Sequence, residues 1–312
     1  MSSLTRREVL AGGVLTATSL TPLTSTLLPN KDRKRVLRFG HLTDIHVQPE
    51  ANAGKGMEQA LIHMQSQKDK VEFLVTGGDQ IMDSFGADAP RTEAQWKIWQ
   101  DVLKANLKVP AAHCIGNHDV WSWPSETKTE SRRGKVWAQE AMGLAKPYYS
   151  FDRAGWRWIV LDSTFPAGGG YTAKLDEEQF EWLKGELART DKKTPIIVVT
   201  HEPLFCVCSF LDGENEKTGN WVVPGAWMHI DFRRIKTLFN QYPNVKLAIS
   251  GHMHMVDRVE YLGVTYLCNG AVCGSWWSGN YHEFPPGYAV IDLYDDGSFE
   301  HEFVTWGWKE EG

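Results

Sequence analysis

Short apolar runs alternate with longer amphipathic stretches through most of the chain. Arg35–Thr43, Val71–Thr76 and Ala111–Ile115 are apolar runs of strand length. Between them, Met57–Lys68 and Thr92–Lys108 carry apolar residues near helical spacing. An order of strand, helix, strand, helix, strand is typical of parallel βαβ units. The pattern therefore predicts an α/β fold that begins with three parallel strands.

The alternation continues in the middle of the chain and then changes. We expect further strands and helices, in chain order, at Tyr148–Phe151, Trp156–Asp162, Asp176–Arg189 (helix), Ile196–Thr200, Asp231–Asn240 (helix) and Val245–Ser250. The run Ile196–Thr200 is so apolar that both of its faces are expected to be covered. Turn residues then separate hairpin-like strands at Arg258–Tyr261, Val264–Cys268, Tyr288–Leu293 and Ser298–Trp306. The C-terminal part is thus predicted to be rich in strands, and Glu202–His229 to be a long functional loop.

Composition narrows the class of protein. The chain has 312 residues, of which 42% are hydrophobic and 23% charged, as in ordinary globular proteins. The net charge of -6, without blocks of like charge, argues against nucleic acid as a partner. The five cysteines are scattered and form no CxxC pair, so we expect buried thiols rather than a disulfide framework or zinc ribbon.

The first 34 residues form a segment of a different kind. Arg6 and Arg7 directly precede a weakly apolar stretch from Val9 to Leu28, which is rich in hydroxyl residues and contains Pro22. Such a stretch is a poor membrane span. It resembles a twin-arginine export signal, which implies a periplasmic or other extracytoplasmic location; the alternative is a disordered basic tail. We therefore expect an export signal and linker at 1–34 and a catalytic domain at 35–312.

Five polar clusters directly follow five of the apolar runs. They are Asp44-Ile45-His46, Gly78-Asp79, Gly116-Asn117-His118-Asp119, His201, and Gly251-His252-Met253-His254. In open α/β sheets, ligands bind outside the carboxyl ends of the strands. Asp44 and Asp79 are 35 residues apart, and Asp79 and Asn117 are 38 apart, each about the length of a βαβ crossover. Neighbouring parallel strands are therefore expected to bring the clusters side by side.

The chemistry of these clusters predicts a metal site. Imidazole nitrogens with carboxylate and amide oxygens, and no thiolate, suit Mn, Fe, Zn, Co or Ni. Seven such groups exceed the three or four that one catalytic zinc uses, and a carboxylate can bridge two cations. Two metals about 3.5–4 Å apart can clamp the attacking and leaving oxygens of an in-line displacement, and they lower the pKa of a bound water. Phosphoryl transfer to water fits that arrangement.

The ordered blocks DxH, GD, GNHD, H and GHxH resemble the calcineurin-like metallophosphoesterase superfamily, from about Arg35 to Tyr294. The resemblance implies a four-layer α/β/β/α sandwich with mixed sheets and a metal-dependent phosphoesterase activity. The segment Asn269–Trp277, followed by Pro285–Tyr288, resembles bacterial members described as cyclic-nucleotide-phosphodiesterase-like. Met82 stands where the related purple acid phosphatases carry a tyrosine, so a tyrosinate-bound ferric ion is not expected.

Residue roles follow from the resemblance. One metal ion would be held by Asp44, His46, Asp79 and His254, and the other by Asp79, Asn117, His201 and His252. Asp79 would then be the bridge. His118 would hydrogen-bond the phosphate and protonate the leaving oxygen, and Asp119 would orient the loop. The glycines Gly78, Gly116 and Gly251 would permit tight turns and close approach of backbone to metal.

The substrate is less constrained than the metals. Trp121, Trp123, Trp221, Trp227, Trp276, Trp277 and Tyr281 occupy the loops around the clusters and either stack a base or sugar or pack the loops onto the core. His229 and His282 are further candidate substrate contacts. We expect a small phosphodiester, such as a cyclic nucleotide or glycerophosphodiester. The alternatives are a phosphomonoesterase with the same site and a non-catalytic metal- or phosphate-binding module.

Overall fold

The computed structural model describes residues 32–123, 131–213 and 215–308. The predicted export signal, with Arg6 and Arg7, lies outside these residues. In the part of the chain that is described, no helix has both the length and the apolar character that a membrane span requires. The described residues contain the whole of both sheets and every expected ligand.

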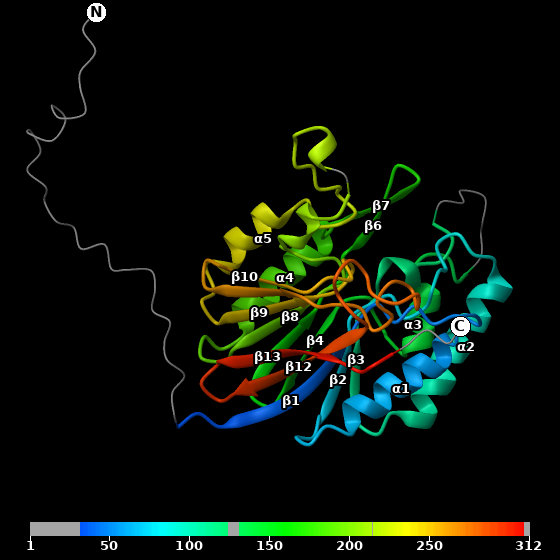
Figure 1. Ribbon diagram of the computed structural model, residues 1–312. Coiled ribbons are helices and arrows are strands. Elements are labelled where there is room, and N and C mark those ends of the chain that lie inside the picture. Colours follow the sequence, from blue (N-terminus) through cyan, green and yellow to red (C-terminus); the bar gives the residue numbers. More distant parts are fainter. Residues whose placement is uncertain (1–31, 124–130, 214, 309–312) are drawn as a thin grey trace, which may run out of the picture. The chain divides into compact units, whose positions relative to one another are not determined.

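A first sheet carries the three parallel strands predicted at the start of the chain. Its order is β13-β12-β1-β2-β3 (Figure 1). The bounds are β1 Arg35–Leu42, β2 Phe73–Thr76, β3 Ala111–His113, β12 Gly287–Tyr294 and β13 Phe299–Thr305. β1, β2 and β3 are parallel, whereas β12 and β13 are antiparallel to their neighbours. The carboxyl ends of β1, β2 and β3 therefore meet at one edge.

A second sheet is built from the middle of the chain. Its order is β10-β11-β9-β8-β5-β4. The bounds are β4 Tyr149–Arg153, β5 Trp156–Val160, β8 Ile196–Val199, β9 Val245–Ser250, β10 Asp257–Tyr261 and β11 Val264–Cys268. Parallel pairing links β5, β8, β9 and β11. Three of the five polar clusters follow neighbouring parallel strands of the first sheet, as the spacings predict, and the other two follow neighbouring parallel strands of the second sheet.

The two sheets face each other across an apolar layer. Leu37 and Phe39 of β1 share this layer with Ile197 and Val199 of β8. Alternate residues point the other way, so Leu42 joins the helix-covered core outside the first sheet and Val198 the one outside the second. The covering helices are α1 Ala53–Gln65 and α2 Ala89–Asn106 on the first sheet, and α4 Glu177–Arg189 and α5 Phe232–Phe239 on the second (Figure 1). The four-layer α/β/β/α sandwich is confirmed, as is the two-sided burial of β8.

Three short elements were absent from the predicted pattern. These are α3 Val136–Met142 and the hairpin of β6 Thr164–Ala167 and β7 Gly170–Ala173. A seven-residue helix and two four-residue strands are too short for a periodicity to emerge. α1 also begins before its predicted start. Gly56 reads as a helix breaker, but a side chain there would collide with Trp277, so the glycine serves close packing inside the helix.

Candidate metal centre

The seven expected ligands converge where the two sheets end. Turns after β1, β2 and β3 carry Asp44, His46, Asp79 and Asn117, and turns after β8 and β9 carry His201, His252 and His254. Ligand atoms of Asp79, His201 and His252 lie within 4.8 Å of one another, as do those of His46, Asp79 and His118. We call the seven expected ligands the metal-ligand cluster: Asp44, His46, Asp79, Asn117, His201, His252 and His254.

The backbone of the metal-ligand cluster is strained. Asp44, His46, Asp79, His252 and His254 all have positive φ angles, between 50° and 72°. Non-glycine residues rarely occupy this region, and such strain gathers at functional sites where the surroundings hold it. Here the turns hold each other, since the Asp44 amide donates to the Gly78 carbonyl at 3.1 Å and the His46 amide to the Asp79 carbonyl at 3.0 Å. The ligands are therefore placed by backbone geometry before any ion binds.

Two glycines make room for this arrangement. Gly78 has φ of 100°, and a Cβ atom there would run into the ring of His201. A Cβ atom on Gly251 would collide with the side chains of Thr43 and Asp44. The close approach expected of these glycines is thus required by side chains of the cluster itself.

Asp79 faces imidazoles from both sheets. Its Oδ2 atom lies 3.1 Å from Nε2 of His201 and 3.7 Å from Nε2 of His46. Its Oδ1 atom accepts a hydrogen bond from the His118 amide at 2.8 Å. One carboxylate oxygen is therefore within reach of a histidine from each of the two expected ligand sets, the position that a bridging carboxylate needs.

His201 shows that a cation fits between these groups. Its Nδ1 lies 2.8 Å from the Gly77 carbonyl, to which it can only donate. With that tautomer, the bare Nε2 lone pair faces Asp79 Oδ2 and, at 3.2 Å, Asn117 Oδ1. Three acceptors facing one another require a cation or a proton. Burial lowers the pKa of His201, but Asp79 and Asp44 outweigh it and raise the pKa well above its usual value.

His46 and His254 form the second group of donors. Their Nε2 atoms are 3.1 Å apart, and Nδ1 of His254 donates to the Gly274 carbonyl at 2.6 Å. Asp44 Oδ1 lies 3.5 Å from Nε2 of His254. Burial lowers the pKa of His46 well below its usual value, so its imidazole is neutral and offers a lone pair. A neutral imidazole beside a buried carboxylate suits a transition-metal ion.

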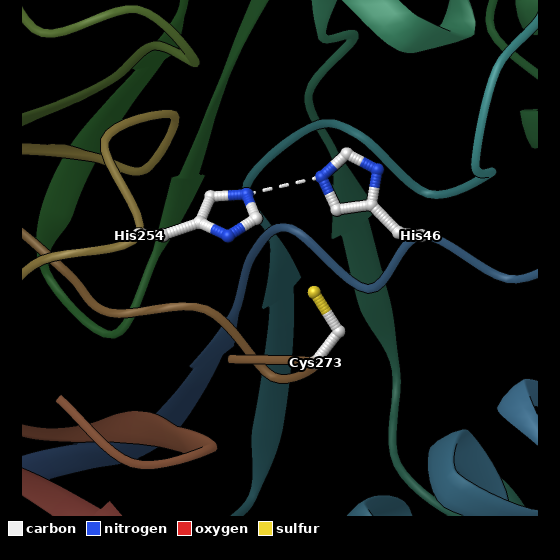
Figure 2. A group of neighbouring side chains, drawn as sticks. All are labelled: His46, His254 and Cys273. Atoms are coloured by element: carbon white, nitrogen blue, oxygen red, sulfur yellow. Dashed lines mark hydrogen bonds between the residues drawn. The ribbon is translucent and has the colours of Figure 1, made fainter. Parts of the chain in front are cut away.

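Two residues beside the cluster were not identified as site residues from the sequence. Cys273 is fully buried, and its sulfur lies with ring nitrogens of His46 and His254 inside 4.8 Å (Figure 2). Burial raises the pKa of Cys273 well above its usual value, so it is a neutral thiol. All five cysteines are free and buried, as expected. Thr43 donates from Oγ1 to Asp44 Oδ2 at 2.7 Å. Its position directly before the Asp-x-His block was the available signal.

His118 and Asp119 lie beside the cluster in different surroundings. Nδ1 of His118 donates to the Met82 carbonyl, and Nε2 lies 4.0 Å from Asp79 Oδ2 on the side of the cavity. Asp119 is fully buried and accepts hydrogen bonds from the amides of Gln80 at 2.8 Å and Gly116 at 2.9 Å. Burial raises the pKa of Asp119 to about 8, and the charge of Asp79 acts in the same direction. Asp119 therefore braces the turn and His118 faces the open space.

A cavity of about 170 Å³ adjoins the metal-ligand cluster. Five of its lining residues belong to neither the metal-ligand cluster nor its turns, and we call them the pocket rim: Tyr171, Asp212, Trp227, Trp276 and Tyr281. The Trp276 ring lies 4.7 Å from that of His254, and the Tyr281 ring lies 5.4 Å from it. The pocket rim and the metal-ligand cluster therefore line the same cavity.

The other aromatic candidates have structural roles. Trp121 and Trp277 are buried in the core, at 4.9 Å from Trp137 and 5.2 Å from Trp308 respectively. Trp123 packs against the same core from the side, and Trp221 is 63% exposed and does not line the cavity.

The two outlying histidines differ from each other. His229 is buried and hydrogen-bonds Asp231 at 3.0 Å through Nδ1, just before α5, so it is no pocket residue. His282 is exposed, and its Nε2 lies 3.7 Å from Oδ1 of the rim residue Asp212. Only His282 stands near the space where a substrate would lie.

Comparisons with known proteins agree with this geometry. Residues 37–256 match the calcineurin-like phosphoesterase family. The chain is 21% identical over 286 residues to the 3',5'-cyclic adenosine monophosphate phosphodiesterase CpdA of Escherichia coli (strain K12), which covers 88% of this chain and 90% of the relative. It is 23% identical over 219 residues to the human serine/threonine-protein phosphatase CPPED1, covering 69% and 63%.

Solved structures agree in fold. A dimetal phosphatase from Danio rerio superposes with a TM-score of 0.59 at 14% identity, covering 88% of this chain and all of that one. The match of the family to more than half of the chain, over the strands and turns that carry the metal-ligand cluster, decides the assignment. The chain belongs to the calcineurin-like phosphoesterase family and is a metal-dependent phosphoesterase.

Proposed function

We propose that the chain hydrolyses a small phosphodiester with the help of two metal ions. The observation that carries the proposal is the lining of the cavity, which in the described part of the chain contains no lysine or arginine. A terminal phosphate carries about two negative charges at neutral pH, and enzymes hold it with cationic side chains. A diester carries one charge and needs no such clamp. The similarity to CpdA of Escherichia coli, a cyclic adenosine monophosphate phosphodiesterase, supports a diester.

The metal-ligand cluster supplies two overlapping donor sets. One comprises Asp44, His46, Asp79 and His254, and the other Asp79, Asn117, His201 and His252. Nitrogen and oxygen donors of this kind suit Mn, Fe, Zn or Co. When bound, two such ions would neutralise the phosphate and lower the pKa of the attacking water.

His118 is the residue placed to move a proton. Its Nδ1 atom is occupied by the Met82 carbonyl, which fixes the ring. His118 lines the cavity, and its side chain is 29% exposed. In the protonated form, Nε2 would donate to the phosphate and then to the leaving oxygen, a contribution of about 10²–10⁴ in rate. Asp119 keeps the turn in place by accepting the amides of Gly116 and Gln80.

A phosphomonoesterase remains the second candidate, since the human phosphatase CPPED1 is similar over 69% of the chain. Initial rates on a diester, bis(p-nitrophenyl) phosphate, and on a monoester, p-nitrophenyl phosphate, distinguish the phosphodiesterase from the phosphomonoesterase. They are measured after reconstitution with Mn, Fe, Zn or Co. We expect at least about tenfold higher kcat/KM on the diester. The reverse preference would select the phosphomonoesterase. About two bound metals per chain without turnover of either ester would favour a non-catalytic binding module.

We also propose export through the twin-arginine route. The support is the pair Arg6-Arg7 before a weakly apolar stretch with many hydroxyl residues. Such a route carries a folded protein, which suits one that acquires its metals before export. Changing Arg6 and Arg7 to lysine should retain the protein in the cytoplasm of a bacterium that has this route, as measured by cell fractionation. Unchanged export of the variant would contradict the proposal.

A further inference from the structure

The pocket rim is unusual for a site that binds phosphate esters. It combines four aromatic rings, Tyr171, Trp227, Trp276 and Tyr281, with the carboxylate of Asp212. Aromatic rings alone would suit any flat group, including a nucleobase. A carboxylate is a poor neighbour for an anionic substrate unless the substrate also carries a positive charge. The rim therefore favours a ligand that carries a positive charge in addition to the phosphate.

The rim is organised around Tyr281. Its ring stands perpendicular to that of Trp276, with centroids 5.5 Å apart and an interplanar angle of 89°. Its hydroxyl donates to Asp212 Oδ1 at 3.2 Å. Because the ring of Tyr281 touches His254 and its hydroxyl touches Asp212, the carboxylate lies one tyrosine beyond the metal-ligand cluster. Trp227 joins the lining from the same segment as Asp212.

With metal ions bound, the cavity would carry opposite charges at the metal-ligand cluster and at the pocket rim. Two metal ions at the cluster would attract the phosphate. At the rim, the negatively charged side chain is that of Asp212. The distance from its Oδ1 atom to Nε2 of the exposed His282 is 3.7 Å. Aromatic faces beside a carboxylate attract organic cations. The arrangement matches a substrate with a phosphate at one end and a cation at the other.

We propose that the pocket rim is a subsite for a small organic cation, and that the substrate is a phosphodiester in which one alcohol is a quaternary amino alcohol such as choline. This inference rests on the proposed phosphodiesterase function. The volume of about 170 Å³ supports it, because drug-sized ligands occupy cavities of about 300–1,000 Å³. A trimethylammonium ethyl group is smaller than a nucleoside and leaves room for the phosphate.

The test is a pair of esters that differ in one atom. p-Nitrophenyl phosphocholine and p-nitrophenyl 3,3-dimethylbutyl phosphate have the same leaving group and shape, but a carbon replaces the charged nitrogen in the second. For the full chain loaded with metal we expect kcat/KM to be about tenfold higher for the choline ester, mostly through KM. Equal values would overturn the cation subsite while leaving the phosphodiesterase standing. Turnover of neither ester would instead count against the proposed function.

Variants locate the effect. Asp212→Asn keeps an acceptor for Tyr281 but removes the charge, and Trp276→Leu removes a ring. We expect each to reduce the preference for the choline ester at least about threefold, because kcat/KM for the choline ester should fall more than kcat/KM for the neutral ester. Trp221→Leu, in the same segment as Asp212 but outside the cavity, and Asp101→Asn, on the surface of α2, are the matched controls. A preference that survives both rim variants would contradict the proposal.

A binding measurement keeps the inference testable without turnover. Calorimetric titration with phosphocholine and with 3,3-dimethylbutyl phosphate compares the same cation with its neutral isostere. We expect phosphocholine to bind about tenfold more tightly, and Asp212→Asn to abolish most of the difference. Equal affinities would overturn the subsite whatever the rates are. Metal content, measured in each sample, separates loss of the cation subsite from damage to the metal-ligand cluster.

Discussion

The metal-ligand cluster and the pocket rim share one cavity but are built in opposite ways. Ligands of the cluster follow directly after strands, and most are fully buried on strained backbone. Rim residues lie in the hairpin β6–β7, the segment 202–229 and the segment after β11, and are half-buried. Ring contacts and one hydrogen bond between side chains hold the rim, whereas interlocked turns hold the cluster.

This difference separates reaction from specificity. Strand ends are held by their own sheet, and the two sheets are packed together across an apolar layer, so the cluster keeps one geometry and with it one reaction class. Loops tolerate substitution and insertion with little cost to the core, so the rim can change its ligand while the chemistry stays the same. Damage to the cluster should therefore act on metal content and turnover, and damage to the rim on KM.

The largest effect is expected from Asp79→Asn. Asp79 faces histidines of both donor sets, so loss of its charge should empty both metal positions and lower kcat/KM by at least about 10³-fold. Elemental analysis of the purified variant and initial rates on a diester check this. Asp152→Asn, at an exposed carboxylate of β4, is the control. Retention of both metals would show that Asp79 is not the bridge.

His118→Asn should separate metal binding from turnover, because His118 lies beside the metal-ligand cluster without belonging to it. The ring lies beside the ligands but is expected to move a proton, so metal content should stay near that of wild type while kcat falls about 10²–10⁴-fold. The same two measurements apply. Loss of metal equal to that of Asp79→Asn would mean that His118 is a ligand.

Thr43→Val tests how the cluster is braced. The change keeps the shape of the side chain but removes the hydrogen bond to Asp44 Oδ2. Partners of metal ligands typically contribute about 10–100-fold to metal affinity, and we expect a loss in that range. Competition with a chelator of known affinity measures it. An unchanged metal affinity would show that the strained backbone alone orients Asp44.

Trp227→Leu tests the rim outside the proposed charge contacts. Removal of one ring of several should raise KM for a diester about threefold, with kcat and metal content unchanged. Steady-state kinetics and elemental analysis are the readouts. A fall in kcat without a change in KM would show that Trp227 supports the metal-ligand cluster. That result would contradict the assignment of the rim to substrate binding alone.

The last test concerns the stability of the fold beneath the cluster, at His41 of β1. Burial lowers the pKa of this fully buried histidine to about 3, whereas the unfolded chain titrates near 6.5. Between these values the unfolded state binds the extra proton, so the free energy of unfolding must fall as pH falls. In His41→Gln that dependence should be weaker by up to about 1.4 kcal/mol per pH unit. Urea unfolding of chelator-treated protein between pH 7 and 4 measures it, with the exposed His282→Gln as control.

The sequence by itself determined the reaction class and the ligand identities that were put forward. Each polar block directly follows an apolar run, and that adjacency survives folding because a strand delivers the next residues to its own end. Glycines such as Gly78 and Gly251 could be assigned for the same local reason, since their turns are fixed by the residues beside them.

Only the tertiary structure decided how the two sheets share the cluster and which side chains form the rim. Tyr171 lies in strand β7, whereas Asp212 and Tyr281 lie in two separate loops, and no periodicity relates the three. Cys273 reaches His46 only because the segment after β11 folds back over the turn after β1. The secondary structure of a short segment depends mainly on the residues within that segment. Contacts between distant loops depend on the packing of whole layers, which one sequence does not reveal by spacing alone.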